Sequence, residues 1–222
     1  MDRRHLVVIM AAAIVLALQF AERERAPLAT RNPQRATLKI AVLGDSVAHG
    51  AGDESGRGGI AGRLGAANFG IDGARTFAVM TLLERADVRA VLRGADVVVL
   101  SIGGNDLYGD TAARLTTLVA PGYAIHRTIH RIAAIVTRIH GASPSARVVL
   151  LGLYDPYRTP WLDEQVALWD SALIAHFARD AQVDVVRIAD LFAYKARLSP
   201  IDRFHPSAEG YALIAARIAS TW

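Results

Sequence analysis

The chain has 222 residues, of which 52% are hydrophobic and 21% charged, a composition typical of one globular domain. The absence of cysteine excludes a disulfide framework, a thiol nucleophile and any cysteine-ligated metal. The formal net charge is +4, but the 25 basic residues are interspersed with 21 acidic ones and form no basic stripe, so we expect no nucleic-acid partner.

The N-terminus carries an apolar segment, residues 6–20, which follows three basic residues at positions 3–5. This layout is typical of a signal peptide, although the segment lacks a clear cleavage site and is shorter than the ~20 residues of a spanning helix. We interpret residues 1–21 as a signal peptide or membrane anchor and the charged, proline-containing residues 22–37 as a linker. Residues 38–222 are then the functional domain. We expect it to be extracytoplasmic, either secreted or anchored to the membrane through residues 6–20.

Strand and helix signals alternate along the domain. A glycine-rich segment, residues 50–62, imitates a dinucleotide-binding fingerprint but does not follow a strand directly, so we expect a loop leading into a short helix. Apolar strands are predicted at residues 38–43, 66–71, 96–102, 147–153 and 183–188. Helices are predicted at residues 76–92 (one or two), 121–140 with Gly141 as a cap, 162–181, and 207–218 with Ser207 as the N-cap.

This alternation indicates an α/β fold with a parallel sheet covered by helices on both faces, a three-layer α/β/α sandwich. In such sheets, ligands bind beyond the carboxyl ends of the strands. Polar residues that directly follow strands are therefore candidate site residues.

Four short blocks in a fixed order carry the chemical signal. Each is weak alone, because turns are rich in glycine, aspartate and serine. The blocks are Gly-Asp-Ser at 44–46, NFGIDG at 68–73, GGND at 103–106 and DRFHP at 202–206. Together they resemble the SGNH, or GDSL-type, hydrolase family of esterases and lipases, from about Lys39 to the C-terminus. The resemblance also implies a flavodoxin-like five-stranded sheet in the order 2-1-3-4-5, which brings the loops after the first three strands together.

A serine hydroxyl is a poor nucleophile unless a base and an orienting group assist it. The resemblance implies that Ser46 is the nucleophile, that His205 is the base and that Asp202 orients it. It also implies an oxyanion hole made of the backbone N–H groups of Ser46 and Gly73 and the side-chain amide of Asn105. Beside these, Asp45 and Asp106 are interpreted as turn-fixing residues.

Other patterns point to weaker alternatives. His126 and His130 are spaced as a helical metal pair, but no third ligand accompanies them, so we expect no metal site. Four aromatic residues after the fourth strand could line an acyl or leaving-group pocket or merely pack under the loop: Tyr154, Tyr157, Trp161 and Trp169. The chain contains neither GxSxG nor GK[ST], which argues against an α/β-hydrolase nucleophile elbow and a P-loop.

The sequence therefore predicts a cofactor-free serine esterase acting on a small-molecule, lipid or carbohydrate ester. Two alternatives remain open at this point. The same residues would serve acyl transfer to a sugar or lipid, and a binding or scaffold protein could have kept the fold without turnover.

Overall fold

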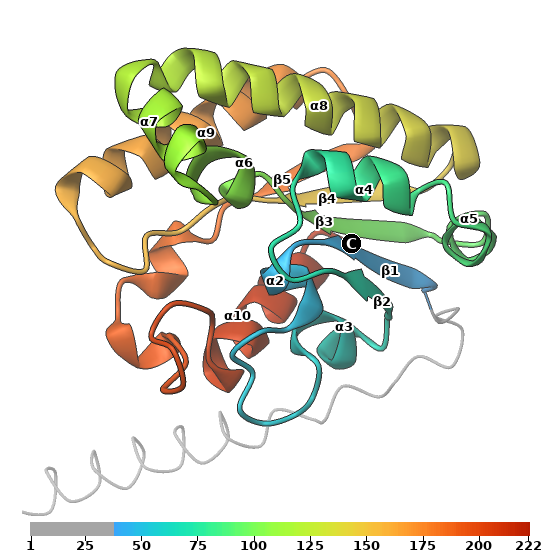
Figure 1. Cartoon of the computed structure of the whole chain (residues 1–222). Coiled ribbons are helices and arrows are strands. Elements are labelled where there is room, and N and C mark those ends of the chain that lie inside the picture. The colour runs from blue at the N-terminus through green and yellow to red at the C-terminus, as the bar shows by residue number, and fades with distance from the viewer. Residues whose placement is uncertain (1–37) are drawn as a thin grey trace, which may run out of the picture. The chain divides into compact units, whose positions relative to one another are not determined.

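The computed structural model describes residues 38–222, in which five parallel strands form one sheet (Figure 1). The order β2-β1-β3-β4-β5 confirms the predicted topology and the α/β fold class. The strands are β1 (Ile40–Gly44), β2 (Ala67–Gly70), β3 (Val97–Ser101), β4 (Arg147–Leu151) and β5 (Val183–Val186). The predicted signal peptide or anchor and the linker, residues 1–37, lie outside the described residues.

The sheet is buried on both faces because its strands are apolar at nearly every position. Successive side chains point to opposite faces, so Val98 and Leu100 enter one hydrophobic core while Val97 and Val99 enter the other. All four are at most 2% exposed. A strand buried on both faces shows no polar alternation, which is why these strands appear in the sequence as continuous apolar runs.

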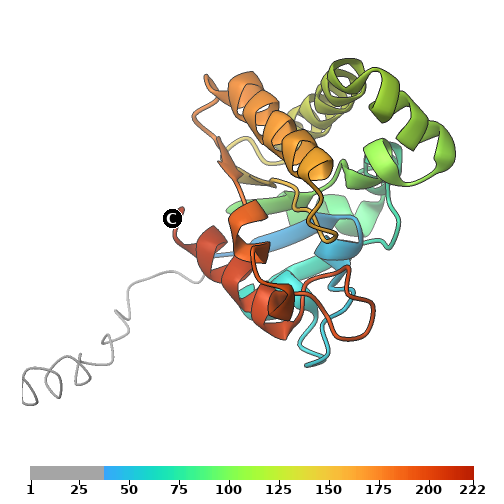
Figure 2. The same ribbon diagram turned by 90° about the vertical axis from the view of Figure 1, so that its left-hand side faces the viewer.

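Helices cover both faces, as Figure 2 shows with the sheet seen from its side. On one face lie α4 (Thr76–Leu82), α5 (Ala86–Leu92), α8 (Pro121–Ala142) and α9 (Pro160–Phe177), and on the other lie α3 (Gly59–Leu64) and α10 (Ala208–Ala219). The remaining elements are α2 (Ser46–His49), α6 (Gly104–Tyr108), α7 (Thr111–Val119) and two 3-10 turns, η1 (Ala189–Phe192) and η2 (Lys195–Arg197).

Two helix boundaries differ from the sequence prediction. Gly141 does not cap α8: the helix continues to Ala142, and Ser143 ends it with its N–H donating to the carbonyl of Ile139. The prediction was wrong because packing of the long apolar stripe of α8 on the sheet outweighs the weak helix propensity of one glycine. The segment 76–92 forms two helices, α4 and α5, as the sequence allowed.

The sheet order places a switch point between β1 and β3. Chains leaving β1 and β3 turn toward opposite faces of the sheet, and ligands of open α/β sheets bind in the crevice that this creates. In Figure 1, α2 and α6 lie at this end of the sheet, directly after β1 and β3.

Among residues 38–222, no helix combines the length and apolar character needed to cross a bilayer.

Candidate active site

Ser46 is presented by a tight turn at the end of β1. Gly44 has φ +136°, and a Cβ at this position would lie 1.8 Å from the carbonyl oxygen of Ser101 on β3. The N–H of Asp45 donates to that same carbonyl at 2.9 Å. Only glycine therefore fits between the two strands, and the turn that follows it is fixed to the neighbouring strand.

Asp45 holds the start of α2 from inside the protein. Its carboxylate caps the helix by accepting from the N–H of Val47 at 3.1 Å, and it accepts from the Ser101 hydroxyl at 3.0 Å. Burial raises the pKa of Asp45 to about 6, although these hydrogen bonds work in the opposite direction. The carboxyl is thus a turn-fixing group held in an environment that disfavours its charge.

His205 and Asp202 approach Ser46 from one loop that precedes α10. His205 Nε2 lies 2.9 Å from Ser46 Oγ, and its Nδ1 lies 2.7 Å from Asp202 Oδ2. The other oxygen of Asp202 accepts from the backbone N–H groups of Phe204 and His205. Burial alone would raise the pKa of Asp202, but the hydrogen bonds from His205 and from the backbone outweigh it and hold that pKa below its ordinary value. The structure therefore brings the three predicted residues into one hydrogen-bonded chain.

The loop that carries this pair is closed at its base. Leu198 and Pro206 form an isolated antiparallel bridge, and the N–H of Ser199 donates to the carbonyl of His205 at 2.8 Å. The Tyr154 hydroxyl also donates to the carbonyl of Phe204 at 2.9 Å. We call residues 199–205 the histidine loop.

The predicted oxyanion donors also gather at the serine end of the sheet. Gly73 lies in the loop after β2 with φ +71°, and Asn105 lies in the first turn of α6. The Asn105 amide donates to the carbonyl of Ala74 at 3.0 Å, which leaves its second hydrogen for another acceptor. Within residues 38–222, the backbone N–H groups of Ser46 and Gly73 have no hydrogen-bond acceptor. Three donor groups are thus open to a ligand oxygen.

The buried carboxylate of Asp106 connects the segment that carries Gly73 with the helix that carries Asn105. Asp106, next to Asn105, accepts from the Thr76 N–H at 2.9 Å and from the Thr76 hydroxyl at 2.6 Å. Thr76 begins α4, three residues after Gly73, and both partners are buried. Arg131 of α8 lies 3.5 Å from the same carboxylate. The carboxylate therefore fixes the loop of Gly73 relative to the helix of Asn105.

Sequence reasoning missed Ser101 and Thr76, the partners of the two buried aspartates. Ser101 could have been found from the topology, because it ends the strand that lies beside β1 and pairs with Gly44 in the sheet register. Thr76 offered no comparable signal, since its partner is 30 residues away on another helix.

The aromatic residues after β4 divide into two groups. Trp169 is fully buried against Gly103, and Tyr154 stacks on Phe192, so both pack within the fold. Tyr157 and Trp161 are exposed, at 66% and 42%. Packing within the fold thus holds for Trp169 and Tyr154, and pocket lining stays a prediction for Tyr157 and Trp161.

His126 and His130 of α8 lie side by side, with a third histidine, His176, near His130. The Nε2 atoms of His126 and His130 lie 3.0 Å apart, and the ring of His176 on α9 lies 5.4 Å from that of His130 between centroids. No group of three or more potential metal ligands occurs within the described part of the chain.

Solved structures with the same fold include a lipase and an acetylxylan esterase. A lipase, Lip_vut3 from a goat rumen metagenome, aligns with a TM-score of 0.70 at 20% identity, over 82% of this chain and 96% of the lipase. An acetylxylan esterase from Geobacillus stearothermophilus aligns with a TM-score of 0.60 at 19% identity, over 82% of this chain and 93% of the esterase. At these identities the likeness shows the shared fold.

Sequence comparisons extend this relationship. The protein YpmR of Bacillus subtilis (strain 168) is 28% identical over 205 residues, which cover 82% of this chain and 80% of YpmR. The sequence profile of the GDSL-like lipase/acylhydrolase family matches residues 42–213, from β1 into α10. This range includes all four blocks, and family membership supports an ester hydrolase. The chain belongs to the GDSL-like lipase/acylhydrolase family.

Proposed function

We propose that the protein is a serine esterase that cleaves acyl or acetyl esters by double displacement. Ser46 Oγ attacks the ester carbonyl and gives its proton to His205 Nε2, while Asp202 orients the imidazole and stabilises its charged form. His205 then protonates the departing alcohol, which leaves an acyl group on Ser46. A water molecule activated by His205 releases the acid in the second half of the reaction.

The observation that carries this proposal is the continuous hydrogen-bonded chain from Ser46 through His205 to Asp202. The lowered pKa of Asp202 keeps its carboxylate charged, as the orienting role requires. The N–H groups of Ser46 and Gly73 and the Asn105 amide support it further, because they are available for the oxygen that becomes negative in the transition state.

The test is covalent labelling with a fluorophosphonate. We expect one label on Ser46, and Ser46→Ala should abolish both labelling and the hydrolysis of p-nitrophenyl esters. Ser220→Ala, at an exposed serine at the end of α10, is the matched control and should change neither. A folded, active protein that labels at another residue, or not at all, would contradict the proposal.

We further propose a class of substrate for this esterase. The structural neighbours include a lipase and an acetyl-xylooligosaccharide esterase, so a lipid or an acetylated carbohydrate is the candidate ester. A panel of p-nitrophenyl esters of graded acyl length distinguishes acetyl from long-chain preference. Product analysis with added alcohols separates hydrolysis from acyl transfer, and a labelled serine without turnover of any ester would indicate a binding or scaffold role.

We also propose that the domain acts outside the cytoplasm, held or exported by residues 6–20. The proposal rests on the signal-like order of basic residues followed by an apolar segment. Protease added to intact cells should degrade the domain. Protection in intact cells with digestion only after lysis would place it on the inner side.

A further inference from the structure

Two tyrosines reach the backbone around His205 from the hydrophobic core that lies between the sheet and α10. Tyr154 follows β4 and Tyr211 lies on α10, and both pack in this core. Tyr211 is fully buried, and the ring of Tyr154 stacks on the ring of Phe192, with 4.1 Å between the centroids. Packing therefore fixes both rings, and each presents its hydroxyl at a defined point.

Tyr154 fixes the backbone of His205. Its hydroxyl donates to the carbonyl of Phe204 at 2.9 Å, and the N–H of His205 donates to Asp202 at 3.0 Å. This carbonyl and this N–H belong to the same peptide unit, which is planar. With both of its polar groups bonded, the peptide has a fixed orientation, and so has the bond from which the imidazole side chain extends.

Tyr211 supports the first carbon of the His205 side chain through a neighbouring segment. Its hydroxyl donates to the carbonyl of Ala51 at 2.7 Å. The next residue, Gly52, has φ +81°, and a Cβ there would lie 2.7 Å from the Cβ of His205. The backbone of Gly52 therefore packs directly against His205, and the hydroxyl of Tyr211 holds that backbone in place.

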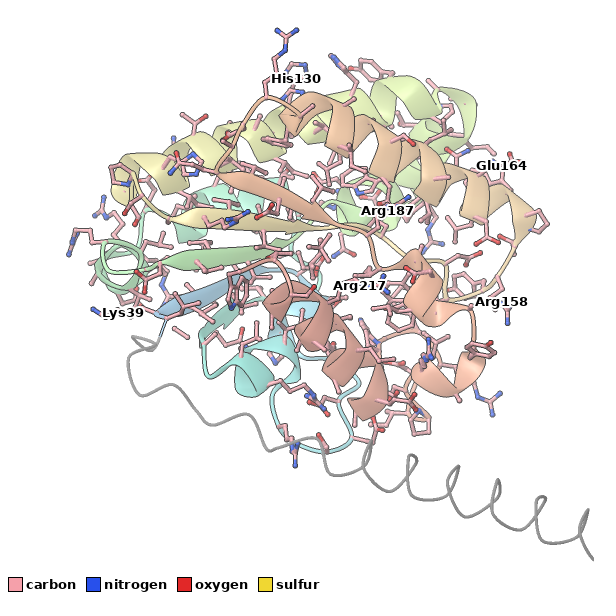
Figure 3. The ribbon with its side chains drawn as sticks, turned by 180° about the vertical axis from the view of Figure 1, so that it is seen from behind. Lys39, His130, Arg158, Glu164, Arg187 and Arg217 are labelled. Atoms are coloured by element: carbon pink, nitrogen blue, oxygen red, sulfur yellow. The ribbon has the colours of Figure 1, made fainter. Side chains whose placement is uncertain are left out.

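The helix α10, which carries Tyr211, is fixed near both of its ends. Arg63 of α3 donates to the carbonyl of Ala208 at 2.9 Å. Arg217 donates to the carbonyl of Arg187 at 2.9 Å, and Figure 3 shows Arg187 just beyond β5 and Arg217 on α10. Tyr211 is thus attached to the sheet and its helices and not to the histidine loop.

Both hydroxyls keep their protons. Burial holds the pKa of Tyr154 well above its ordinary value, and the nearby carboxylates of Asp45 and Asp202 raise it further. Burial likewise raises the pKa of Tyr211. The two groups therefore remain hydrogen-bond donors throughout the neutral pH range.

We propose that Tyr154 and Tyr211 are positioning residues that set the distance between His205 and Ser46; this inference rests on the proposed function. They act through the backbone around the histidine and not on the reacting atoms. Proton transfer from serine to histidine requires hydrogen-bond distance, and the 2.9 Å contact provides it. Without either hydroxyl, a carbonyl loses its donor and His205 is free to shift away from the serine.

The test removes each hydroxyl and keeps the ring, in Tyr154→Phe and in Tyr211→Phe. A misplacement of about 1 Å can cost about 100-fold in rate, so we expect kcat for p-nitrophenyl acetate to fall roughly ten-fold for a smaller shift. KM should change little, because no group that would bind the ester is altered. The rate of fluorophosphonate labelling at Ser46 should fall by the same factor as kcat.

Two controls separate positioning from a general loss of stability. Tyr123→Phe removes the hydroxyl of an exposed tyrosine on α8 and should change neither kcat nor melting temperature. Ile218→Val removes one carbon from the core that also contains Tyr211. It should lower the melting temperature by roughly 2 to 4 °C and leave kcat per folded molecule unchanged.

Hydrogen exchange measured by mass spectrometry reads the backbone itself and does not depend on catalysis. The N–H groups of residues 203–205 are hydrogen-bonded, as are those of residues 51 and 53. Exchange at 203–205 should become several-fold faster in Tyr154→Phe, and exchange at 51 and 53 should become faster in Tyr211→Phe.

A kcat per folded molecule that stays within two-fold of the wild type in both variants would overturn the proposal, even if exchange were faster. So would an equal loss of kcat in Ile218→Val. If one variant alone keeps its kcat, that tyrosine is not a positioning residue. A wild-type chain that hydrolyses no ester, with faster exchange in both variants, would refute the proposed function and still support the holding of His205 by the two hydroxyls.

Discussion

The buried carboxyl of Asp45 should cost the fold stability at neutral pH. Asp45 is 6% exposed, and its pKa of about 6 lies well above the ordinary 3.8. Between these two values the folded chain binds a proton that the unfolded chain has lost, so stability falls as the pH rises through this window. Above pH 6 the accumulated cost is about 3 kcal/mol, because each pKa unit corresponds to about 1.4 kcal/mol.

Asp45→Asn should recover much of that free energy. One oxygen of Asp45 accepts both hydrogen bonds, from Val47 and from Ser101, and the carbonyl of asparagine can accept the same two. Asparagine also caps helices as well as aspartate does. We expect the free energy of unfolding to rise by up to about 3 kcal/mol at pH 8, which is about 6 to 12 °C in melting temperature for a domain of this size, and to change little at pH 4.

Urea unfolding of the two proteins at pH values from 4 to 8 measures this difference. Asp110→Asn is the matched control, because Asp110 caps α7 in the same way but is exposed. The N–H of Ala113 and the guanidinium of Arg75 hold the pKa of Asp110 below its ordinary value, so that variant should lose stability at pH 8 and lose less as the pH falls. An Asp45→Asn effect that is the same at pH 4 and pH 8 would show that cap geometry, not buried charge, determines it.

Three further substitutions test the oxyanion hole, the contact that supports it and the end of α8. Asn105→Ala should lower kcat by ~10² to 10³ with little change in KM, as ester kinetics would show, and an unchanged kcat per folded molecule would remove Asn105 from the oxyanion hole. Thr76→Val should destabilise the fold by about 1 to 3 kcal/mol in urea unfolding, since buried Asp106 loses a donor, and an unchanged midpoint would contradict that role. Gly141→Ala should stabilise the chain by about 0.5 to 1 kcal/mol, because this glycine lies inside α8 with no atom near its missing Cβ; a lower melting temperature would contradict the helix boundary.

Much of the fold could be predicted because its signals are local. The apolar strands mark the sheet, the blocks with glycine, aspartate or asparagine that follow the first three strands mark the edge where polar residues gather, and the family resemblance supplied the strand order. The end of α8 could not be predicted, because tertiary packing carries the helix past Gly141. The short helix α7 was missed as well. Its side chains at 115, 118 and 119 are exposed, so it lacks the continuous apolar stripe that identifies a packed helix.

The proposed site likewise contains residues that the sequence could predict and supporting contacts that it could not. Ser46, Asn105 and His205 lie in recognisable blocks, so their positions in the chain could be predicted. The groups that hold these blocks in place could not, because each contact joins residues far apart in sequence: Asp45 with Ser101, and Asp106 with Thr76. Such contacts form only when the sheet and its helices have packed together, so no periodic pattern in the sequence predicts them.

The histidine loop has a consequence for how the protein should respond to heat. It carries both Asp202 and His205, whereas Ser46 belongs to the sheet, and the 2.9 Å contact between His205 and Ser46 joins these two parts. The loop rests on the Leu198–Pro206 bridge and the hydroxyl of Tyr154 and contributes no residue to the cores that stabilise the sheet. Warming can therefore swing the loop away while the rest of the domain stays folded. Hydrolysis should then fade at temperatures below the melting transition and return on cooling, so that the working range of the protein is narrower than its range of stability.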